Sequence, residues 1–300
     1  MLKSKTLCDP LRRRALAGLA GLGLLGLFDP ALAGTGRAPA ESNAAPAVAL
    51  DHTRRWQMHN AAGKAYRIMI SIPDGTPPEN GYPVLYVLDG NAYFPAFHAA
   101  RDTVARYRDT VIVGVGYPEA QSLNFLRRSY DFSPPAPADH NEPPQGGQDA
   151  FLAFIEQRLM PRVVADLPIN PQQQSLFGHS FGGMFAIYAL FNRPGLFAHV
   201  VAASPTLWWD DHYLLPLEPG FAEAMRKRPR NPPSLALIAA EGDTPQEIQE
   251  ARSLADRLEP LFAYGMRSSF ALIPGVDHET VPFEIVPGVM REVFEAGYTP

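Results

Sequence analysis

The chain has 300 residues, of which 46% are hydrophobic and 19% are charged, a composition that excludes a disordered or coiled-coil protein. Its formal net charge of −5 offers no basic field for binding phosphates, which disfavours nucleic acid as a partner. The single cysteine, Cys8, excludes an intramolecular disulfide, a cysteine-based zinc site and a CxxC redox motif.

The first 33 residues have the pattern of an export signal. Five lysines and arginines precede an apolar run at 15–28 that is too short to span a bilayer comfortably. Ala31-Leu32-Ala33 then supplies the small-x-small pattern of a signal-peptidase site. A membrane anchor or a buried first helix is the alternative, although such a glycine-rich run propagates poorly as a helix. The arginines at 12–14 leave both Sec and Tat export open.

Removal of this signal changes the protein that remains. Five basic and two acidic residues leave with it, so the net charge becomes −8, and Cys8 is lost. A chain without thiols suits an oxidising compartment, and we expect the protein in the periplasm. The predicted organisation is a signal peptide at 1–33, a flexible leader at 34–50 and a single catalytic domain at 51–300.

Short apolar runs alternate with helix-like segments along this domain. The middle runs are continuously apolar, as expected for parallel strands that are covered on both faces. The alternation predicts an α/β fold with a doubly wound, mostly parallel sheet and an N-terminal antiparallel hairpin. In chain order, we expect strands at 66–72, 84–88, 111–115, 175–177, 199–203, 235–240 and 268–273, and helices at 151–164, 184–191 and 248–264.

A proline-rich segment at 133–147 interrupts this alternation. Its five prolines exclude regular structure. We expect a surface loop that follows a strand and therefore lies near the carboxyl edge of the sheet, where such folds bind ligands. A loop without a functional role is the alternative.

The most informative motif is Gly178-His179-Ser180-Phe181-Gly182. It matches GxSxG, and it stands between an apolar strand and a helix-capable run, the context that a nucleophile elbow requires. The turn is so tight that Ser180 is expected in a strained conformation, with Gly178 and Gly182 removing Cβ atoms that would clash. The motif places the Ser180 hydroxyl at the amino end of a helix, whose dipole favours a developing negative charge. An ordinary βα turn is the alternative.

A serine nucleophile needs a base, which in this fold follows the last strand. His278 stands there, and a surface-loop histidine is the alternative. The acid that orients the base should follow the preceding strand, where Asp243 and Glu241 are the candidates. Asp277 adjoins the base, but neighbours in a tight loop usually point apart. If neither candidate reaches His278, the site is a Ser-His dyad.

Acyl transfer also needs hydrogen-bond donors for the oxyanion. One predicted donor is the backbone N–H of Phe181, the residue after the nucleophile. The other is the backbone N–H of Asn91, in the loop after the strand at 84–88, where Gly90 is expected to allow a sharp turn. Asp89-Gly90 as a common turn is the alternative.

Three stretches carry a family resemblance: 83–94 (PVLYVLDGNAYF), 178–211 (GHSFGGMFAIYALFNRPGLFAHVVAASPTLWWDD) and 274–282 (PGVDHETVP). They resemble the esterase D-like family of α/β-hydrolases, and within it the periplasmic esterases of ferric enterobactin and salmochelin. The likeness covers 51–300 and implies an α/β-hydrolase fold, with the family's nucleophile at Ser180 and its base at His278. Periplasmic members lack a well-placed acid, which supports the dyad.

The resemblance also suggests residues that bind the substrate. A ferric tris-catecholate is a rigid trianion with aromatic faces. Arginine can form ion pairs and hydrogen bonds with such an anion and can stack on its aromatic rings. Arg127 and Arg128 follow the strand at 111–115, and Trp208 and Trp209 follow the strand at 199–203, at the same edge. We expect at least one of each pair to line the pocket. Core packing of a tryptophan and surface salt bridges of the arginines are the alternatives. Local arginines would have to offset the repulsion from the net charge of −8.

These features predict a periplasmic serine esterase. Ser180 attacks a lactone carbonyl of a catecholate siderophore of the ferric enterobactin type, His278 is the base, and cleavage helps to release iron. No cofactor and no stable membrane span are expected in the mature chain. No protein-bound metal is expected either, because iron enters only as part of the substrate. The alternatives are a general carboxylesterase of small acyl or sugar esters and a non-catalytic siderophore-binding protein. The preferred siderophore and the need for bound iron stay open at this point.

Overall fold

The computed structural model of the chain describes residues 49–103, 107–136, 143–227 and 229–295, with side chains as far as residue 291. The predicted signal peptide and nearly all of the predicted leader lie outside these residues, so both stay predictions. Within the described part of the chain, no helix has the length and hydropathy that a membrane span requires.

The described residues form an eight-stranded mixed sheet in the order β1-β2-β4-β3-β5-β6-β7-β8. β1 and β2 form an antiparallel hairpin, β2 is antiparallel to β4, and all further pairs are parallel. This is the α/β-hydrolase fold, as predicted. The strands are β1 Thr53–His59, β2 Ala65–Ser71, β3 Tyr82–Leu88, β4 Val111–Gly116, β5 Ile169–His179, β6 His199–Ala203, β7 Ser234–Ala240 and β8 Arg267–Ile273.

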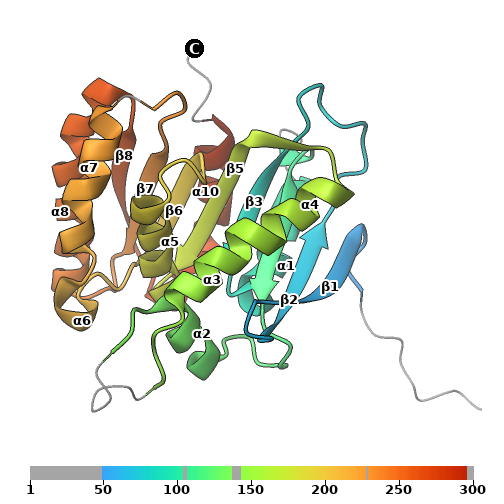
Figure 1. Cartoon of the computed structure of the whole chain (residues 1–300), viewed down its shortest axis with the longest axis horizontal. Helices are drawn as coiled ribbons and strands as arrows, with labels where there is room; N and C mark the ends of the chain where they lie inside the picture. Colours follow the sequence, from blue (N-terminus) through green and yellow to red (C-terminus); the bar gives the residue numbers. More distant parts are fainter. Residues whose placement is uncertain (1–48, 104–106, 137–142, 228, 296–300) are drawn as a thin grey trace, which may run out of the picture. The chain divides into compact units, whose positions relative to one another are not determined.

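Helices cover both faces of the sheet (Figure 1). The side chains of α1 and α10 join one hydrophobic cluster, and those of α3, α4, α5, α7 and α8 join another. The helices are α1 Gly90–Thr103, α2 Phe125–Phe132, α3 Gln148–Phe154, η3 Ile155–Leu159, α4 Met160–Asp166, α5 Phe181–Asn192, α6 Trp209–His212, η4 Leu215–Leu217, α7 Glu218–Arg226, α8 Pro245–Leu258, η5 Glu259–Tyr264, α9 Val281–Glu284 and α10 Val286–Glu295.

The predicted strands fall within observed ones, except that the strand predicted at 66–72 ends one residue earlier, at Ser71. Every residue of β4 and β7 is buried, because helices pack on both sides of these strands. The sequence predicted the N-terminal hairpin but gave no bounds for its first strand, β1, an edge strand whose residues are only partly buried or exposed. The sequence prediction missed α1 and α10, which contain prolines and begin at or near glycines.

Two predicted segments need correction. The helix expected at 151–164 is longer, because α3, a π-helical turn η3 and α4 run on continuously from Gln148 to Asp166. The proline-rich segment at 133–147 follows the helix α2 rather than a strand, since α2 was missed in the sequence. Residues 137–142 of this segment lie outside the described part of the chain.

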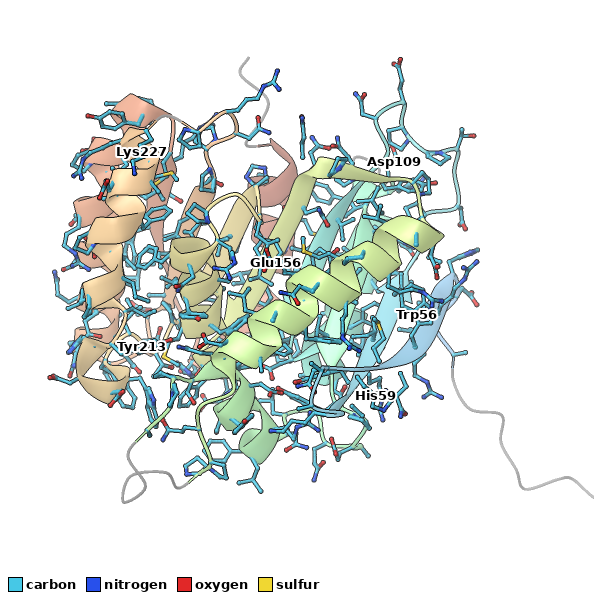
Figure 2. The ribbon with its side chains drawn as sticks, viewed as in Figure 1. Trp56, His59, Asp109, Glu156, Tyr213 and Lys227 are labelled. Carbon is cyan, nitrogen blue, oxygen red and sulfur yellow. The ribbon has the colours of Figure 1, made fainter. Side chains whose placement is uncertain are left out.

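The connections bring several helix starts to one edge of the sheet. α1, α2, α5 and α6 begin after β3, β4, β5 and β6, at the carboxyl ends of these parallel strands. This carboxyl edge is the lower edge in Figure 1, where α2 and α6 lie. His59 marks the same edge in Figure 2, and Asp109 marks the opposite one. The predicted functional loops therefore meet at one edge.

The turn from β5 into α5 is as tight as the GxSxG motif predicts. Ser180 has φ 59° and ψ −120°, a strained conformation for a residue with a side chain. A Cβ atom on Gly178 would lie 2.0 Å from the carbonyl oxygen of Gly182, so only glycine fits there. The prediction that Gly182 also relieves a clash is wrong, since a Cβ there would come no closer than 3.4 Å to Asp89. The second crowded position in this turn is Gly183, where a Cβ atom would lie 3.2 Å from the carbonyl oxygen of Ala203.

Substitution of Gly178 tests this turn. We expect Gly178→Ala to lower the free energy of unfolding by about 2–3 kcal/mol, because a Cβ and a backbone oxygen cannot share this space. Gly220→Ala is the matched control, since a Cβ there meets nothing within 4 Å and α7 gains a better helix former, for a gain of about 0.5 kcal/mol. Urea denaturation of both variants measures the difference, and equal midpoints would contradict the packing argument.

Candidate active site

Ser180 lies at the amino end of α5, half-buried at the carboxyl edge of the sheet. Its backbone N–H donates to the carbonyl of Ala203 at 2.9 Å, which holds the elbow against β6. Its hydroxyl lies 3.3 Å from the hydroxyl of Thr206, a buried residue just after β6. The nucleophile that the sequence predicts is thus presented above the sheet by a rigid backbone.

The structure brings Asp243 and His278 together. Asp243 Oδ1 lies 2.7 Å from His278 Nδ1, and the Asp243 side chain is fully buried. The other candidate acid, Glu241, accepts a hydrogen bond from the backbone N–H of Gly275 at 2.8 Å and so supports the loop that carries His278. Of the two carboxylates that the sequence left open, Asp243 is the one in contact with the predicted base.

A network around Asp243 keeps it ionised. Burial alone would raise the pKa of Asp243, but hydrogen bonds from His278, from Ser204 and from the backbone N–H of Ala240 outweigh burial and lower it. The hydrogen bond to Asp243 raises the pKa of His278 above its usual value, against the effect of burial, and the charges of Glu247 and Glu279 add to the rise. The pair is therefore arranged to stabilise a protonated imidazole, as a general base requires.

Ser204 is a part of this network that the sequence analysis missed. Its hydroxyl donates to Asp243 Oδ2 at 2.5 Å, and the N–H of Ala240 donates to the same oxygen at 2.8 Å. Ser204 has φ 40°, a rare conformation for a residue other than glycine. A serine just after β6 carries no distinctive pattern, so no sequence signal could have pointed to it.

His179 packs beneath the predicted base. Its ring lies 4.8 Å from that of His278, and its Nδ1 is 3.0 Å from the hydroxyl of Tyr93. Burial, with the nearby charges of His278 and Arg128, lowers the pKa of His179 to about 3, so this histidine is neutral. A neutral ring can support His278 without competing for its proton.

The predicted oxyanion donors stand at the starts of two helices that follow adjacent strands. Phe181 is the first residue of α5 and Asn91 the second of α1, positions whose N–H groups have no intrahelical acceptor. β3 and β5, which precede these helices, are adjacent in the sheet. The Asn91 side chain is used elsewhere, since its Nδ2 donates to the carbonyls of Tyr117, Glu119 and Gln121 at 2.9–3.1 Å.

The expected reason for Gly90 needs correction. The positive φ in this loop belongs to Asp89 (50°), not to Gly90. Gly90 is required by close packing, because a Cβ there would lie 2.7 Å from the carbonyl carbon of Gly114 on β4.

Arg128 is not free to bind a substrate through its charge. It forms a buried ion pair with Asp89, to which its Nε and Nη2 donate at 2.9–3.2 Å, and Nη2 also donates to the carbonyl of His179 at 3.1 Å. Both side chains are nearly inaccessible. The pair joins the loop after β3, the helix α2 and the end of β5. This corrects the expectation that Arg128 lines the pocket, because its charge is balanced inside the protein.

Arg127 is also held by protein groups, although its side chain is 23% exposed. It donates to the carbonyl of Ala65 at 3.0 Å, lies 3.8 Å from Asp131, and stands over the rings of Tyr66 and Tyr117. These contacts fix the start of α2 against β2. The predicted role of Arg127 in substrate binding stays a prediction.

The two tryptophans follow β6 and lie near Phe181, the residue after Ser180, and neither is fully buried. The ring of Trp209 meets that of Phe181 edge to face at 4.7 Å. Trp208 is 39% exposed, and its Nε1 donates to Glu247 at 3.1 Å. Their place beside Phe181 and Glu247 agrees with the predicted pocket position, and contact with a substrate stays a prediction.

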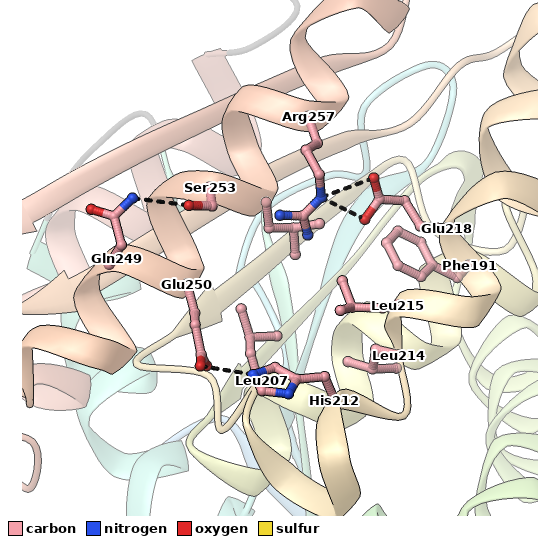
Figure 3. A pocket seen from close by; sticks show the side chains of 11 residues that line it. Phe191, Leu207, His212, Leu214, Leu215, Glu218, Gln249, Glu250, Ser253 and Arg257 are labelled. Carbon is pink, nitrogen blue, oxygen red and sulfur yellow. Dashed lines mark hydrogen bonds and ion pairs between the residues drawn. The ribbon is translucent and has the colours of Figure 1, made fainter.

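A cavity of about 260 Å³ lies between the segment that begins at Leu207 and the helix α8 (Figure 3). His212 bonds Glu250 at 2.8 Å and Arg257 bonds Glu218 at 3.0 Å across it. With the contact between Trp208 and Glu247, these bonds hold the segment after β6 along one face of α8.

One group of side chains has the spacing of metal ligands. Asp243, Glu247 and His278 each place a ligand atom within 4.8 Å of the others. A cation there would replace the hydrogen bond between Asp243 and His278, which already occupies one atom of each. The arrangement is therefore better suited to holding a proton, and the absence of a protein-bound metal stays a prediction.

The fold and this arrangement define the class: an α/β-hydrolase with a strained serine, a histidine paired to a buried aspartate, and two helix starts beside the serine. The chain belongs to the family described as "Putative esterase", which it matches over residues 59–262. It is 33% identical over 247 residues to the ferri-bacillibactin esterase BesA of Bacillus subtilis (strain 168), covering 76% of this chain and 84% of that protein.

Two further likenesses agree with this assignment. The chain is 34% identical over 203 residues to the siderophore triacetylfusarinine C esterase of Aspergillus fumigatus, covering 63% of this chain and 68% of that one. Among solved structures, the BES protein from Bacillus cereus matches with a TM-score of 0.77 and 29% identity, over 85% of this chain and 99% of that one.

Substitution of the acid distinguishes a triad from the Ser-His dyad. We expect Asp243→Asn to lower kcat on a simple ester by about 10⁴-fold, because the paired histidine loses its correct tautomer and its counter-charge. Glu241→Gln is the control and should stay within about threefold of the unchanged protein, since Glu241 bonds a loop N–H rather than His278. Full activity of Asp243→Asn would show that the site works as a dyad.

The raised pKa of His278 predicts the pH dependence. The base must be neutral, so kcat/KM should fall as the pH drops through a value above the usual 6.5. Glu247→Gln removes a charge that raises this pKa, and should move the acid limb to lower pH.

Glu250→Gln is the control for this shift, because Glu250 lies one turn further along α8 and bonds His212. Profiles of kcat/KM from pH 5 to 9 measure both variants. A limb that moves in Glu250→Gln but not in Glu247→Gln would contradict the assignment.

Proposed function

We propose that the protein is an exported serine esterase that hydrolyses the ester bonds of a siderophore backbone in the periplasm. The observation that carries the proposal is the geometry of Asp243 and His278, which lie 2.7 Å apart, with the His278 ring 4.8 Å from that of His179, the residue before the strained Ser180. Family membership supports ester hydrolysis, and the names of the two relatives above support a siderophore ester as the substrate.

The proposed reaction uses each part of the site. When the substrate binds, the Ser180 hydroxyl turns from its partner Thr206 to form a hydrogen bond with His278. Catalytic hydrogen bonds often form or shorten only in the complex with substrate. Ser180 Oγ attacks the carbonyl carbon, and its proton passes to His278 Nε2. The N–H groups of Phe181 and Asn91 donate to the oxyanion.

Collapse of this intermediate breaks the ester bond. His278 returns the proton to the departing alcohol oxygen, and an acyl-enzyme remains on Ser180. A water then attacks the acyl carbon with His278 again as base, which releases the carboxylic acid and restores Ser180. Asp243 stays ionised throughout and orients the imidazole.

The proposed substrate is the trilactone of a catecholate siderophore of the enterobactin type. Opening one lactone turns a preorganised ring into a flexible chain, which weakens its hold on iron. The aromatic side chains of Phe181, Trp208 and Trp209 offer apolar surface next to Ser180 for catechol rings. Export follows from the pattern at 1–33, which predicts cleavage after Ala33.

Hydrolysis of a trilactone tests the proposal. The purified protein and its Ser180→Ala variant are incubated with enterobactin, and the products are separated by chromatography. We expect the linear trimer to form with the unchanged protein at least about 10³-fold faster than with Ser180→Ala. Ser268→Ala is the control, because this hydroxyl donates to the carbonyl of Ala255 beneath β8 and should leave the rate unchanged.

Two results would favour the alternatives. Rapid release of nitrophenol from p-nitrophenyl butyrate, with no cleavage of the trilactone, would indicate a general carboxylesterase. Tight binding of enterobactin without hydrolysis that depends on Ser180 would indicate a siderophore-binding protein.

A further inference from the structure

The carboxyl edge of the sheet carries a marked excess of acidic side chains. The described segments at the strand ends that surround Ser180 contain ten aspartates and glutamates but only three cations, Lys64, Arg127 and Arg128. Residues 137–142, outside the described part, contain no lysine or arginine either. The segments counted are 60–64, 89–91, 117–132, 204–212, 241–247 and 274–279.

The three cations are occupied by partners within the protein. Arg128 is buried against Asp89, and Arg127 lies between Asp131 and the rings of Tyr66 and Tyr117. The ammonium of Lys64 stands 3.1 Å from the centre of the Tyr130 ring. The charge of Arg128 is therefore balanced by Asp89, that of Arg127 is partly offset by Asp131, and Lys64 is held over an aromatic ring.

The acidic side chains, by contrast, flank the base and the nucleophile. Glu247 places an oxygen within 4.8 Å of His278, and Asp277 and Glu279 are its exposed neighbours in the chain. Asp210 and Asp211 are exposed and follow Trp209, whose ring contacts Phe181. On the segments 204–212, 241–247 and 274–279, every charged side chain apart from the histidines is negative.

We propose that this acidic edge selects for electrically neutral ester substrates and rejects anionic ones, with Asp210 and Asp211 as specificity-determining residues. The inference rests on the proposed siderophore-ester hydrolysis and names the charge of its substrate. Like charges around a half-buried site raise the energy of an approaching anion, and the effect grows with the charge of the anion. The preferred form is a neutral metal-free trilactone or a chelate that stays neutral when it holds iron. The ferric tris-catecholate, which carries three negative charges, is the poorer substrate.

Two pairs of probes test this selection. p-Nitrophenyl butyrate and mono-p-nitrophenyl succinate are similar in size and differ by one negative charge. Metal-free and ferric enterobactin differ by about three. At an ionic strength near 10 mM, where the Debye length is about 30 Å, we expect kcat/KM to favour the neutral member about threefold in the first pair and more than about tenfold in the second. At about 0.5 M salt both preferences should shrink to less than half, because screening removes the repulsion.

A double variant identifies the residues that select. Asp210→Asn/Asp211→Asn removes two charges but keeps the side-chain shapes, and asparagine tolerates the left-handed backbone at these positions, with φ of 46° and 50°. At low salt we expect kcat/KM for ferric enterobactin to rise about tenfold, and that for p-nitrophenyl butyrate to stay within about twofold.

The matched control is Asp74→Asn/Asp109→Asn. It makes the same change of charge with two exposed aspartates at the opposite edge, which Figure 2 marks by Asp109. We expect less than about a twofold change for the ferric form, because the distance and screening weaken the effect.

The outcomes separate this inference from the proposed function. Faster cleavage of the ferric form than of the metal-free form at low salt would overturn the charge selection and leave siderophore hydrolysis standing. Hydrolysis of the nitrophenyl esters with the expected preference, but of neither enterobactin, would overturn the proposed function and keep the charge selection. Equal effects of the two double variants would show that the total charge acts, not Asp210 and Asp211.

Discussion

The buried ion pair between Asp89 and Arg128 is the contact on which the catalytic edge depends. It links the loop after β3, the helix α2 and, through the carbonyl of His179, the residue just before the nucleophile. A charge pair taken out of water stabilises a structure only when its geometry is good and its further hydrogen bonds are made, and removing one partner leaves a costly buried charge. Asp89, in the left-handed region, holds the start of α1 beside that of α5, and these two helix starts carry both predicted oxyanion donors.

The same ion pair shapes what the site can recognise. An arginine at this edge is the natural partner of an anionic chelate, but here its charge is balanced by Asp89. The remaining charges near His278 are carboxylates, and they have two effects. They raise the pKa of the base, and in the selection that we propose they repel anions from the nucleophile. In the proposed function the substrate is then recognised by shape and apolar surface, to which Phe181, Trp208 and Trp209 would contribute.

Features of this chain that depend on neighbouring residues could be predicted from the sequence, whereas features that depend on contacts between distant residues could not. Ser180 could be predicted because its elbow is a local structure: the glycine, the strand before it and the helix after it are all adjacent in the chain. The buried strands could be predicted because covering both faces leaves a continuous apolar run. α1 and α10 could not, since their prolines and glycines are typical of turns and only packing on the sheet overrides that preference. The choice between Glu241 and Asp243 is also non-local, because it depends on where β8 and its following loop lie relative to β7.

The sequence by itself therefore determined the class of fold and the positions of the candidate nucleophile and the candidate base, since each follows from local pattern and chain order. The tertiary structure decided the rest. It paired Asp243 with His278, added Ser204 and His179 to the site, and assigned Arg128 to Asp89 rather than to a substrate. The physical reason is that the partner of a charged group depends on distance and burial, and neighbours in space can be tens of residues apart in the chain. A pattern can show that an arginine stands at the right edge, but only the folded packing shows whether its charge is still free.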